Sequence, residues 1–308
     1  MDGILVVAKP AGPTSHDVVA LVRRLSATRR VGHGGTLDPF ASGVLPLFLG
    51  VATRLVEYHL GDSKSYRATV CFGASSTTDD LDGELTPVET AAITKANVIA
   101  ALAGFRGPIV QRPPAFSAVF VGGRRAYALA RAGERPVLPD RAVTIHALDL
   151  TGWDDADPER PIAVLEVRCS AGTYVRALAR DLGVAVDSAA YLGALVRTAS
   201  GPFRIADAVD LETLRGAAAS GPEGLRRHLQ PVDTGLESMA RIALGETEVL
   251  DVVRGRTVSP GAALPDVAEA EPILMTRSDA TVIGVGRRRG GQLEPDKILI
   301  ERESSGGD

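Results

Sequence analysis

The segment 32–46 constrains the fold more than any other part of the sequence. It reads Gly-His-Gly-Gly-Thr-Leu-Asp-Pro-Phe-Ala-Ser-Gly-Val-Leu-Pro, and so many glycines and prolines do not suit an ordinary helix or strand. We therefore predict a shaped loop whose backbone can come close to a ligand. Asp38 is the only acid in this loop. It either acts as a nucleophilic or charge-stabilising carboxylate, or it caps a helix that begins after it, because Asp-Pro is a good helix start.

The rest of the chain alternates short strand patterns with short helix patterns and has no internal repeat. Apolar residues at strand spacing predict strands over 4–8, 66–72, 162–169 and 192–197. Apolar residues at helical spacing predict helices over 15–25, 94–104, 126–132 and from about 174. Thr14 or Ser15 would cap the first helix, and the pair Gly122-Gly123 predicts a hairpin.

The pattern changes near Met239, where a helix is predicted close to 248–254 and short strands over 272–276, 281–286 and 297–300. A chain of 308 residues is long for one compact domain and suits a large domain with a small one. We predict the α+β class. Residues 1–235 would form a domain with a central mixed or antiparallel sheet flanked by helices, 236–302 a small β-rich domain, and 303–308 a disordered tail.

The charge distribution indicates RNA binding, although the net charge of −4 taken alone argues against it. Between Asp17 and Glu57 the only acid is Asp38, and the same window holds five arginines: Arg23, Arg24, Arg29, Arg30 and Arg54. The stretch 106–131 contains several arginines and no acid. Both stretches could meet a phosphate backbone. The alternative is that arginine is simply the preferred base of this chain.

Several classes of protein are excluded by the same sequence. No apolar run reaches the ~20 residues that span a bilayer, and no signal peptide is recognisable, so we expect a cytoplasmic protein without membrane contact. Two cysteines cannot supply the four ligands of a structural zinc site, and we expect no metal. The segment 78–89 approaches the spacing of a calcium-binding loop, but it begins with Thr78 and contains Pro87, so we interpret it as an acidic surface turn.

The segment 34–45 resembles the catalytic motif of the TruB-type tRNA pseudouridine synthases, in which the aspartate is the catalytic residue. Four further segments are similar to motifs of that family in the same order. They are Lys-Pro-Ala-Gly-Pro-Thr-Ser at 9–15, Lys-Ser-Tyr at 64–66, Arg-Pro-Pro-Ala-Phe-Ser-Ala at 112–118, and Cys-Ser-Ala-Gly-Thr-Tyr-Val-Arg at 169–176 with Asp-Leu-Gly at 181–183. The matches extend in register from Lys9 to Phe203.

The resemblance implies a tRNA pseudouridine synthase that isomerises uridine 55 of the T-loop, with Asp38 as the catalytic carboxylate and with no cofactor. The uridine must leave its stack to be reached, so apolar and aromatic groups should line the pocket. Tyr66, Tyr174 and Leu195 match the pocket residues of the family, and His33 would touch an RNA phosphate or the flipped nucleotide. Without the motifs, both tyrosines would be interpreted as core residues and His33 as a solvated loop histidine.

Arg176 is predicted in the first turn of a helix, where the helix dipole disfavours a cation. A specific anionic partner would explain it, and we predict a bidentate pair with Asp38 that keeps the carboxylate ionised. The alternative is a surface arginine bound to solvent. The resemblance further implies a basic RNA-binding insertion at about 106–150 and a PUA-like RNA-binding module at 236–302. Gly34 and Phe120 depart from the family, which commonly has Thr and often Lys at these positions.

Other functions remain open at this point. A non-catalytic RNA-binding protein would explain the arginines but not the isolated acid. A pseudouridine synthase acting at another RNA site would share the motifs. An aspartyl-phosphate phosphotransferase would need a second acid two residues after Asp38, where this chain has Phe40. We expect tRNA, through its T-arm, as the binding partner, and the sequence gives no reason to expect an obligatory protein partner.

Overall fold

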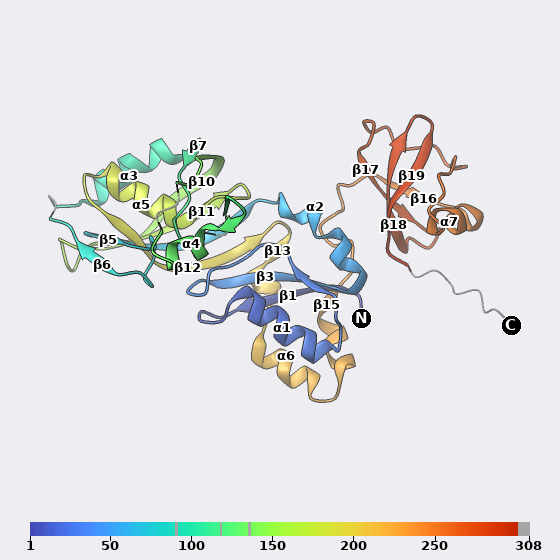
Figure 1. The fold of residues 1–308 in the computed structure, drawn as a ribbon, viewed down its shortest axis with the longest axis horizontal. Helices are drawn as coiled ribbons and strands as arrows, with labels where there is room; N and C mark the ends of the chain where they lie inside the picture. Colours follow the sequence, from blue (N-terminus) through green and yellow to red (C-terminus); the bar gives the residue numbers. More distant parts are fainter. Residues whose placement is uncertain (90–91, 118, 135–136, 301–308) are drawn as a thin grey trace.

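The computed structural model describes residues 1–300 except 90–91, 118 and 135–136. Within these residues, eleven strands form one mixed sheet and four strands form a second, C-terminal sheet (Figure 1). The predicted α+β class is therefore confirmed. The strands of the large sheet are β1 (Gly3–Lys9), β2 (Val31–His33), β3 (Ser42–Leu49), β4 (Lys64–Phe72), β7 (Gly107–Gln111), β10 (Arg141–Asp154), β11 (Ile162–Cys169), β12 (Ala190–Ser200), β13 (Phe203–Arg204), β14 (Val209–Asp210) and β15 (Leu229–Gln230).

Strand β12 joins the two halves of the large sheet, whose order is β14-β1-β3-β12-β4-β11-β10-β7. It pairs in parallel with the start of β3, where Val196 lies opposite Ser42, and antiparallel with β4 along its length. The end of β3 pairs instead with β2, where His33 lies opposite Leu47. The loop 34–41 that connects β2 to β3 therefore lies where β3 changes its neighbour from β2 to β12.

The described residues form seven helices, of which the last packs in the C-terminal module rather than on this sheet. They are α1 (Ser15–Ser26), α2 (Glu57–Leu60), α3 (Lys95–Leu102), α4 (Ala126–Arg131), α5 (Val175–Ala185), α6 (Leu211–Ala218) and α7 (Glu246–Val253), with 3₁₀ turns at Gly50–Leu55, Ala103–Phe105, Ile205–Asp207 and Pro222–His228. Thr14 caps α1 through a capping box with Asp17, as predicted, and Thr94 caps α3. Helix α1 buries Val18, Val19 and Val22 against β1 and β3, and α5 packs on β12.

Three expectations for the main sheet need correction. The segment 32–46 is not a loop throughout, because β2 and β3 occupy its two ends. Gly43 is needed inside β3 because its φ is +110° and a Cβ there would lie 2.2 Å from the Arg197 carbonyl oxygen. Asp38 does not cap a helix, since the next element after the loop is the strand β3. The predicted insertion at 106–150 includes the sheet strands β7 and β10, so only 112–140 leaves the sheet.

Two hairpins extend from the large sheet. One consists of β5 (Ala74–Ser76) and β6 (Leu85–Pro87), and the other of β8 (Phe120–Val121) and β9 (Arg124–Arg125). The second confirms the predicted Gly122-Gly123 turn, and α4 follows it directly.

The C-terminal sheet, β16 (Arg241–Ala243), β17 (Pro272–Thr276), β18 (Val282–Arg289) and β19 (Gln292–Ile298), has a core of its own with α7. The last strand was predicted too late, at 297–300. A separate apolar cluster of Leu55, Leu236, Leu274, Val285 and Leu299 joins this module to the large domain. Residues 303–308, predicted as a disordered tail, lie outside the described residues.

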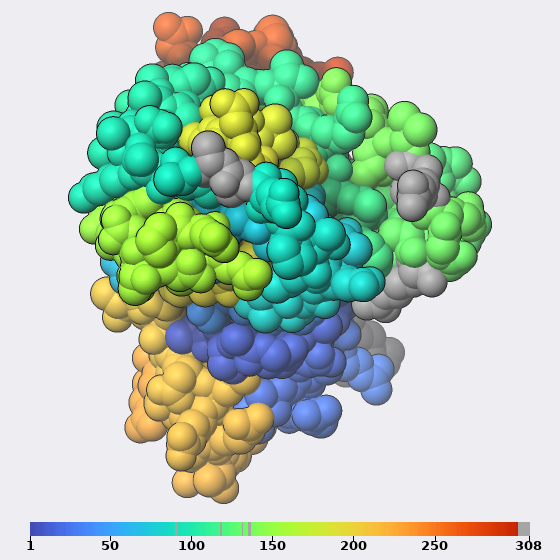
Figure 2. Space-filling model, turned by 90° about the vertical axis from the view of Figure 1, so that its left-hand side faces the viewer, coloured from blue at the N-terminus to red at the C-terminus, as the bar shows by residue number. Residues whose placement is uncertain are grey.

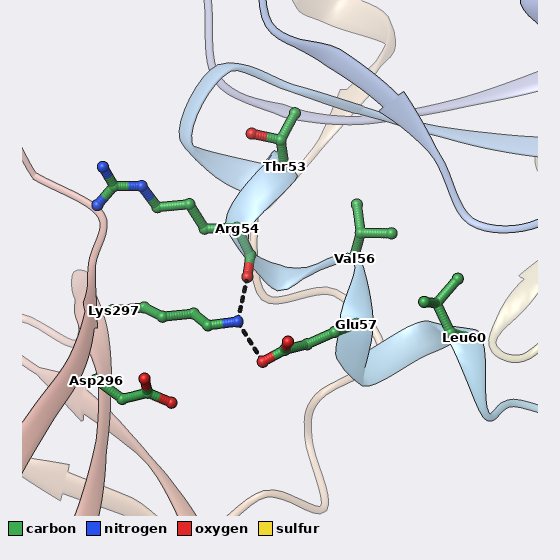
Figure 3. A pocket seen from close by; sticks show the side chains of 7 residues that line it. All are labelled: Thr53, Arg54, Val56, Glu57, Leu60, Asp296 and Lys297. Carbon is green, nitrogen blue, oxygen red and sulfur yellow. Dashed lines mark hydrogen bonds and ion pairs between the residues drawn. The ribbon is translucent and has the colours of Figure 1, made fainter. Parts of the chain in front are cut away.

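Polar contacts border this junction. The Lys297 ammonium donates to the Arg54 carbonyl oxygen at 3.1 Å and pairs with Glu57 (Figure 3). Arg54, Glu57 and Lys297 line a cavity of about 630 Å³ between β19 and the segment 53–60. Along the described part of the chain, no helix is both long and apolar enough to cross a membrane.

Candidate active site

Three buried side chains hold the backbone of the loop 34–41 around Asp38. The Ser15 hydroxyl donates to the Leu37 carbonyl oxygen at 3.0 Å and accepts from the Leu37 amide at 2.9 Å. The Lys9 ammonium donates to the Pro39 carbonyl oxygen at 3.2 Å. The Arg197 guanidinium donates to the carbonyl oxygens of Gly35, Thr36 and Val44 at 3.1, 3.3 and 2.7 Å. The residues on either side of Asp38 are thus fixed by α1, β1 and β12.

The two cations of this set are almost wholly buried. Lys9 also donates to the carbonyl oxygens of Pro10 and Pro13, so all three ammonium donors find acceptors. Burial lowers the pKa of Lys9 to about 8, although the nearby Asp38 carboxylate opposes this shift. Burial also lowers the pKa of Arg197. The Lys-Pro-Ala-Gly-Pro-Thr-Ser motif therefore contributes two supports of the loop, Lys9 and Ser15.

Asp38 forms the predicted ion pair with Arg176, whose Nε lies 3.0 Å from Asp38 Oδ2. The pair is not bidentate. Arg176 Nη1 lies instead 3.1 Å from Asp80 Oδ2 and donates to the Thr78 carbonyl oxygen at 3.0 Å, while Nη2 donates to the Phe116 carbonyl oxygen at 3.0 Å. The Arg176 side chain is 6% exposed and that of Asp38 is 38% exposed. A buried guanidinium thus holds a carboxylate that solvent, and a ligand, can still reach.

The direction in which the pKa of Asp38 is shifted differs from the prediction. Burial raises the pKa of this carboxyl above its ordinary value, and it outweighs the Arg176 guanidinium, which lowers it. The Asp80 carboxylate raises the pKa further and Lys9 lowers it. The expectation that neighbouring arginines favour the ionised form was right about the effect of Arg176 and wrong about the net direction.

The acidic turn at 79–80 belongs to this site and was missed from the sequence. Asp80 is buried beside Arg176, so its interpretation as a surface acid was wrong. Asp79 Oδ2 lies 2.8 Å from Arg180 Nη1, and Arg180 also donates to the Arg112 carbonyl oxygen at 2.9 Å. Arg176 and Arg180 are four residues apart and therefore share one face of α5. That spacing was the signal in the sequence that could have indicated acidic partners, because two arginines on the packed face of a helix need acids to pair with. No group of His, Cys, Asp or Glu side chains in the described residues is placed to hold a metal ion.

Tyr66 and Leu195 lie beside the loop on adjacent strands. Leu195 is buried in the same apolar cluster as Leu37, and Tyr66 packs against that cluster. Tyr66 lies opposite Arg197 in the β4–β12 pairing. Burial raises the pKa of its hydroxyl, and the adjacent Arg197 guanidinium opposes this.

Tyr174 and His33 lie at the ends of elements that reach the site. Tyr174 precedes α5, and the buried Gln111 amide accepts from its backbone N–H at 3.1 Å and donates to its carbonyl oxygen at 3.3 Å. His33 ends β2, and its Nδ1 accepts from the Gly35 amide at 3.3 Å, which leaves the proton of the neutral ring on Nε2. Burial, with the nearby His16, lowers the pKa of His33. The two imidazole rings meet edge to face at 5.6 Å.

Gly34 lies against a buried aromatic ring. A Cβ at this position would lie 3.1 Å from the ring of Phe48, a buried residue of β3. The larger residue that the family commonly has there would require this ring to shift. At the other departure, the exposed Phe120 ring lies 3.8 Å beneath the Arg125 guanidinium.

The fold is similar to that of two solved structures. A solved structure described as an H/ACA RNP bound to a substrate RNA containing 2'-deoxyuridine aligns with a TM-score of 0.73 at 23% identity, covering 98% of this chain and 86% of the other. A Cbf5-Nop10-Gar1 complex aligns with a TM-score of 0.71 at 24% identity, covering 97% and 85%. At these identities the likeness concerns the fold.

Sequence comparison then defines the family. The model of the TruB family pseudouridylate synthase N-terminal domain matches residues 23–175, and that of the tRNA pseudouridylate synthase B C-terminal domain matches 176–237. The tRNA pseudouridine synthase B of Synechococcus sp. (strain WH7803) is 44% identical over 97% of both chains, and that of Thermobifida fusca is 41% identical over 96% of this chain and 97% of the relative. The chain belongs to the TruB family. It is a pseudouridine synthase of tRNA, and therefore an isomerase, as the motifs predicted.

Proposed function

We propose that this enzyme converts uridine 55 in the T-loop of tRNA to pseudouridine, with Asp38 as the catalytic carboxylate. The observation that carries the proposal is the Asp38–Arg176 pair at 3.0 Å in a loop whose backbone is fixed on both sides of the acid. A half-exposed carboxylate on a buried cation can contact a ligand while keeping its orientation. The position in the tRNA comes from the similarity to relatives named tRNA pseudouridine synthase B.

The reaction explains why such a site suffices. The N1–C1′ bond of uridine breaks, the base turns in place, and a C5–C1′ bond forms, while C5 gives its proton to solvent and N1 gains one. No electron is transferred to a cofactor. Asp38 would add to the pyrimidine ring or stabilise the sugar as the glycosidic bond breaks. The base must be flipped out of its stack, and we assign Tyr66, Tyr174 and Leu195 to the walls of its pocket.

The other residues have supporting roles in this proposal. Arg176 orients Asp38 and keeps an ionised form accessible, and Asp80 orients Arg176 in turn. His33 contacts the flipped nucleotide or an adjacent phosphate. Residues 1–235 form the catalytic domain, the basic segment 112–140 contacts the RNA backbone, and the segment 236–302 is a PUA-like RNA-binding module.

Replacing Asp38 tests the catalytic assignment. In tRNA labelled with tritium at C5 of uridine, the wild type should release tritium to solvent, and Asp38→Asn should reduce the rate at least 10⁴-fold, as expected when the essential group of a covalent or charge-stabilising step is lost. Asp82→Asn, which changes an exposed acid of the neighbouring turn, is the matched control and should retain the rate. Release that persists in Asp38→Asn would contradict the assignment. A tRNA with cytidine at position 55 should release nothing, and release from it would point to a different uridine.

The role of the C-terminal module is tested by charge reversal in the intact chain. Arg254 and Arg277 are exposed, so Glu at both positions should leave the fold intact. We expect weaker tRNA binding and an unchanged rate at saturating tRNA, because phosphate contacts contribute to affinity rather than to the chemical step. Unchanged binding would reject this role.

A further inference from the structure

A groove lies at the C-terminal end of α1, away from the loop that carries Asp38. Its cavity of about 530 Å³ is lined by Arg23, Arg24, Ala27, Thr28 and Arg29. In Figure 2 the blue N-terminal segment that includes α1 lies exposed between the cyan segment above it and the gold region of α6.

The groove is strongly cationic. Arg24, Arg29 and Arg30 are exposed, and among the described residues none of them has an acid within ion-pair distance. No acid occurs in the sequence between Asp17 and Asp38. Arg23 is exposed, and its Nη2 donates a hydrogen bond to the Val31 carbonyl oxygen at 2.9 Å.

The helix dipole explains only part of this cluster. Arg23 and Arg24 lie in the last turn of α1, where a cation is favoured. Arg29 and Arg30 lie beyond the end of the helix, where the helix dipole does not stabilise a cation. Four arginines within eight residues, without an acid to offset them, repel one another unless an anion is bound.

The exposed face of α1 connects this groove to the candidate active site. His16, Ala20, Arg24 and Ala27 are exposed at helical spacing, whereas the opposite face is buried in the core. The face begins at His16, whose ring meets that of His33 at 5.6 Å. From His16 to Arg24 the helix rises about 12 Å.

We propose that this face of α1, from His16 to the arginine groove, binds the sugar–phosphate backbone of the tRNA at a distance from the flipped nucleotide. The inference rests on the proposed function, because His33 is taken to lie beside that nucleotide. The groove offers guanidinium forks, which suit phosphate oxygens. No base-reading group is needed, so the contact is independent of sequence and sensitive to salt.

The double variant Arg24→Ala with Arg29→Ala tests this surface. Its affinity for unlabelled tRNA should fall about tenfold or more at 0.1 M salt, and the slope of log affinity against log salt should become less steep by about 1.5 to 2, since two phosphate contacts are lost. The rate of tritium release at saturating tRNA should not change, because the substituted residues do not touch the loop of Asp38. Both arginines are exposed, so thermal unfolding should stay at the wild-type temperature.

Arg160→Ala is the matched control, because Arg160 is exposed in a segment with Asp157 and Glu159. It should leave affinity and salt slope unchanged. The proposal would be overturned if the double variant kept the wild-type affinity and salt slope, or if the control lost as much affinity. It would also be overturned if the double variant bound heparin more weakly than wild type but bound tRNA equally well. The proposed function fails separately. If wild type releases no tritium but binds tRNA through Arg24 and Arg29, the surface stands and the reaction does not.

Discussion

The guanidinium of Arg176 contacts three parts of the chain at once: Asp38 in the loop 34–41, Thr78 and Asp80 in the turn after β5, and Phe116 at the start of the basic segment. Each contact uses a different direction of a planar, rigid group. A point charge of the same sign could satisfy only part of this set. The orientation of Asp38 therefore depends on the shape of the cation beside it as well as on its charge.

Arg176→Lys should consequently fail as a conservative substitution. The ammonium can reach one or two of the partners, so we expect kcat to fall at least 100-fold with a small change in KM, and a loss of about 1–3 kcal/mol of stability from buried groups left without partners. Single-turnover tritium release and urea unfolding measure the two effects. Arg67→Lys, at an exposed pair with Glu166, is the control and should change neither. Retention of the wild-type rate within about threefold would show that charge alone suffices.

The raised pKa of Asp38 sets a pH dependence with a definite sign. In the proposed reaction Asp38 acts as a carboxylate, so the rate should fall as pH decreases, at a higher pH than for an ordinary aspartate. Because the pKa is raised on folding, this group stabilises the native state most at low pH, and the contribution is lost as pH rises through the folded pKa. Asp80→Asn removes a charge that raises the pKa of Asp38. It should move the acid limb of single-turnover kcat to lower pH while lowering the maximum rate, whereas a purely structural role of Asp80 would leave the limb in place.

Some residues of the site could be predicted and others could not. Asp38 and Arg176 were accessible because a lone acid in a glycine-rich loop and a cation at a helix start each require an explanation, and the motif supplied a common one. Asp80 looked like a surface acid, since nothing in the local sequence indicates that Arg176 reaches it from 96 positions further along the chain. Burial of Arg197 likewise follows from the β3–β12 pairing, which local patterns do not encode.

At the scale of elements, α1 and β12 support the loop 34–41 that carries Asp38. The first residue of α1, Ser15, pairs with both backbone groups of Leu37, and Arg197 of β12 holds the carbonyl oxygens before and after the acid. A helix start and a strand are rigid compared with a loop. The loop thereby gains a fixed shape without secondary structure of its own.

Ser15→Ala should remove the hydrogen bonds that link the loop 34–41 to the start of α1. The buried N–H and C=O of Leu37 would both lose their partner, which costs about 1–3 kcal/mol, and kcat should fall because Asp38 is the next residue. Ser26→Ala is the matched control. Ser26 is a buried serine at the far end of the same helix and donates to the Val22 carbonyl oxygen, so its loss should reduce stability by about 1 kcal/mol or less and leave kcat unchanged. Equal effects of the two variants on tritium release would argue against a specific link to the loop.

The sequence predicted the type of most helices and strands because their periodic apolar faces are local signals. The first helix was predicted at 15–25 and found at Ser15–Ser26, and β17 was predicted with its observed bounds. The ends of the segment 32–46 were mistaken for loop because its glycines permit close strand pairing, as at Gly43. Strand β19 begins earlier than predicted because pairing with β18, rather than its own hydrophobicity, determines its extent.

For the whole molecule, an apolar junction joins the C-terminal module to the large domain. Leu55→Ala should cost about 2–5 kcal/mol, since this buried side chain packs with Leu236 and Leu274, and it should weaken tRNA binding by loosening the module. Lys297→Ala removes the ion pair with Glu57 at the border and should cost less than about 1 kcal/mol. Urea unfolding and tRNA affinity of both variants test this. If Lys297→Ala lost more stability than Leu55→Ala, the ion pair rather than the apolar cluster would be what holds the junction together.

The position of β12 between β3 and β4 has a consequence for synthesis. Both neighbouring strands leave the ribosome long before residues 190–200 are made. Until then, the edges of β3 and β4 that will pair with β12 have no partner strand. Exposed edges of this kind are prone to pair with other chains. The same late strand brings Arg197 to the loop 34–41. A chain interrupted after residue 175, where the first family model ends, would lack β12, and with it both the link between the two halves of the sheet and the Arg197 contacts to the loop 34–41.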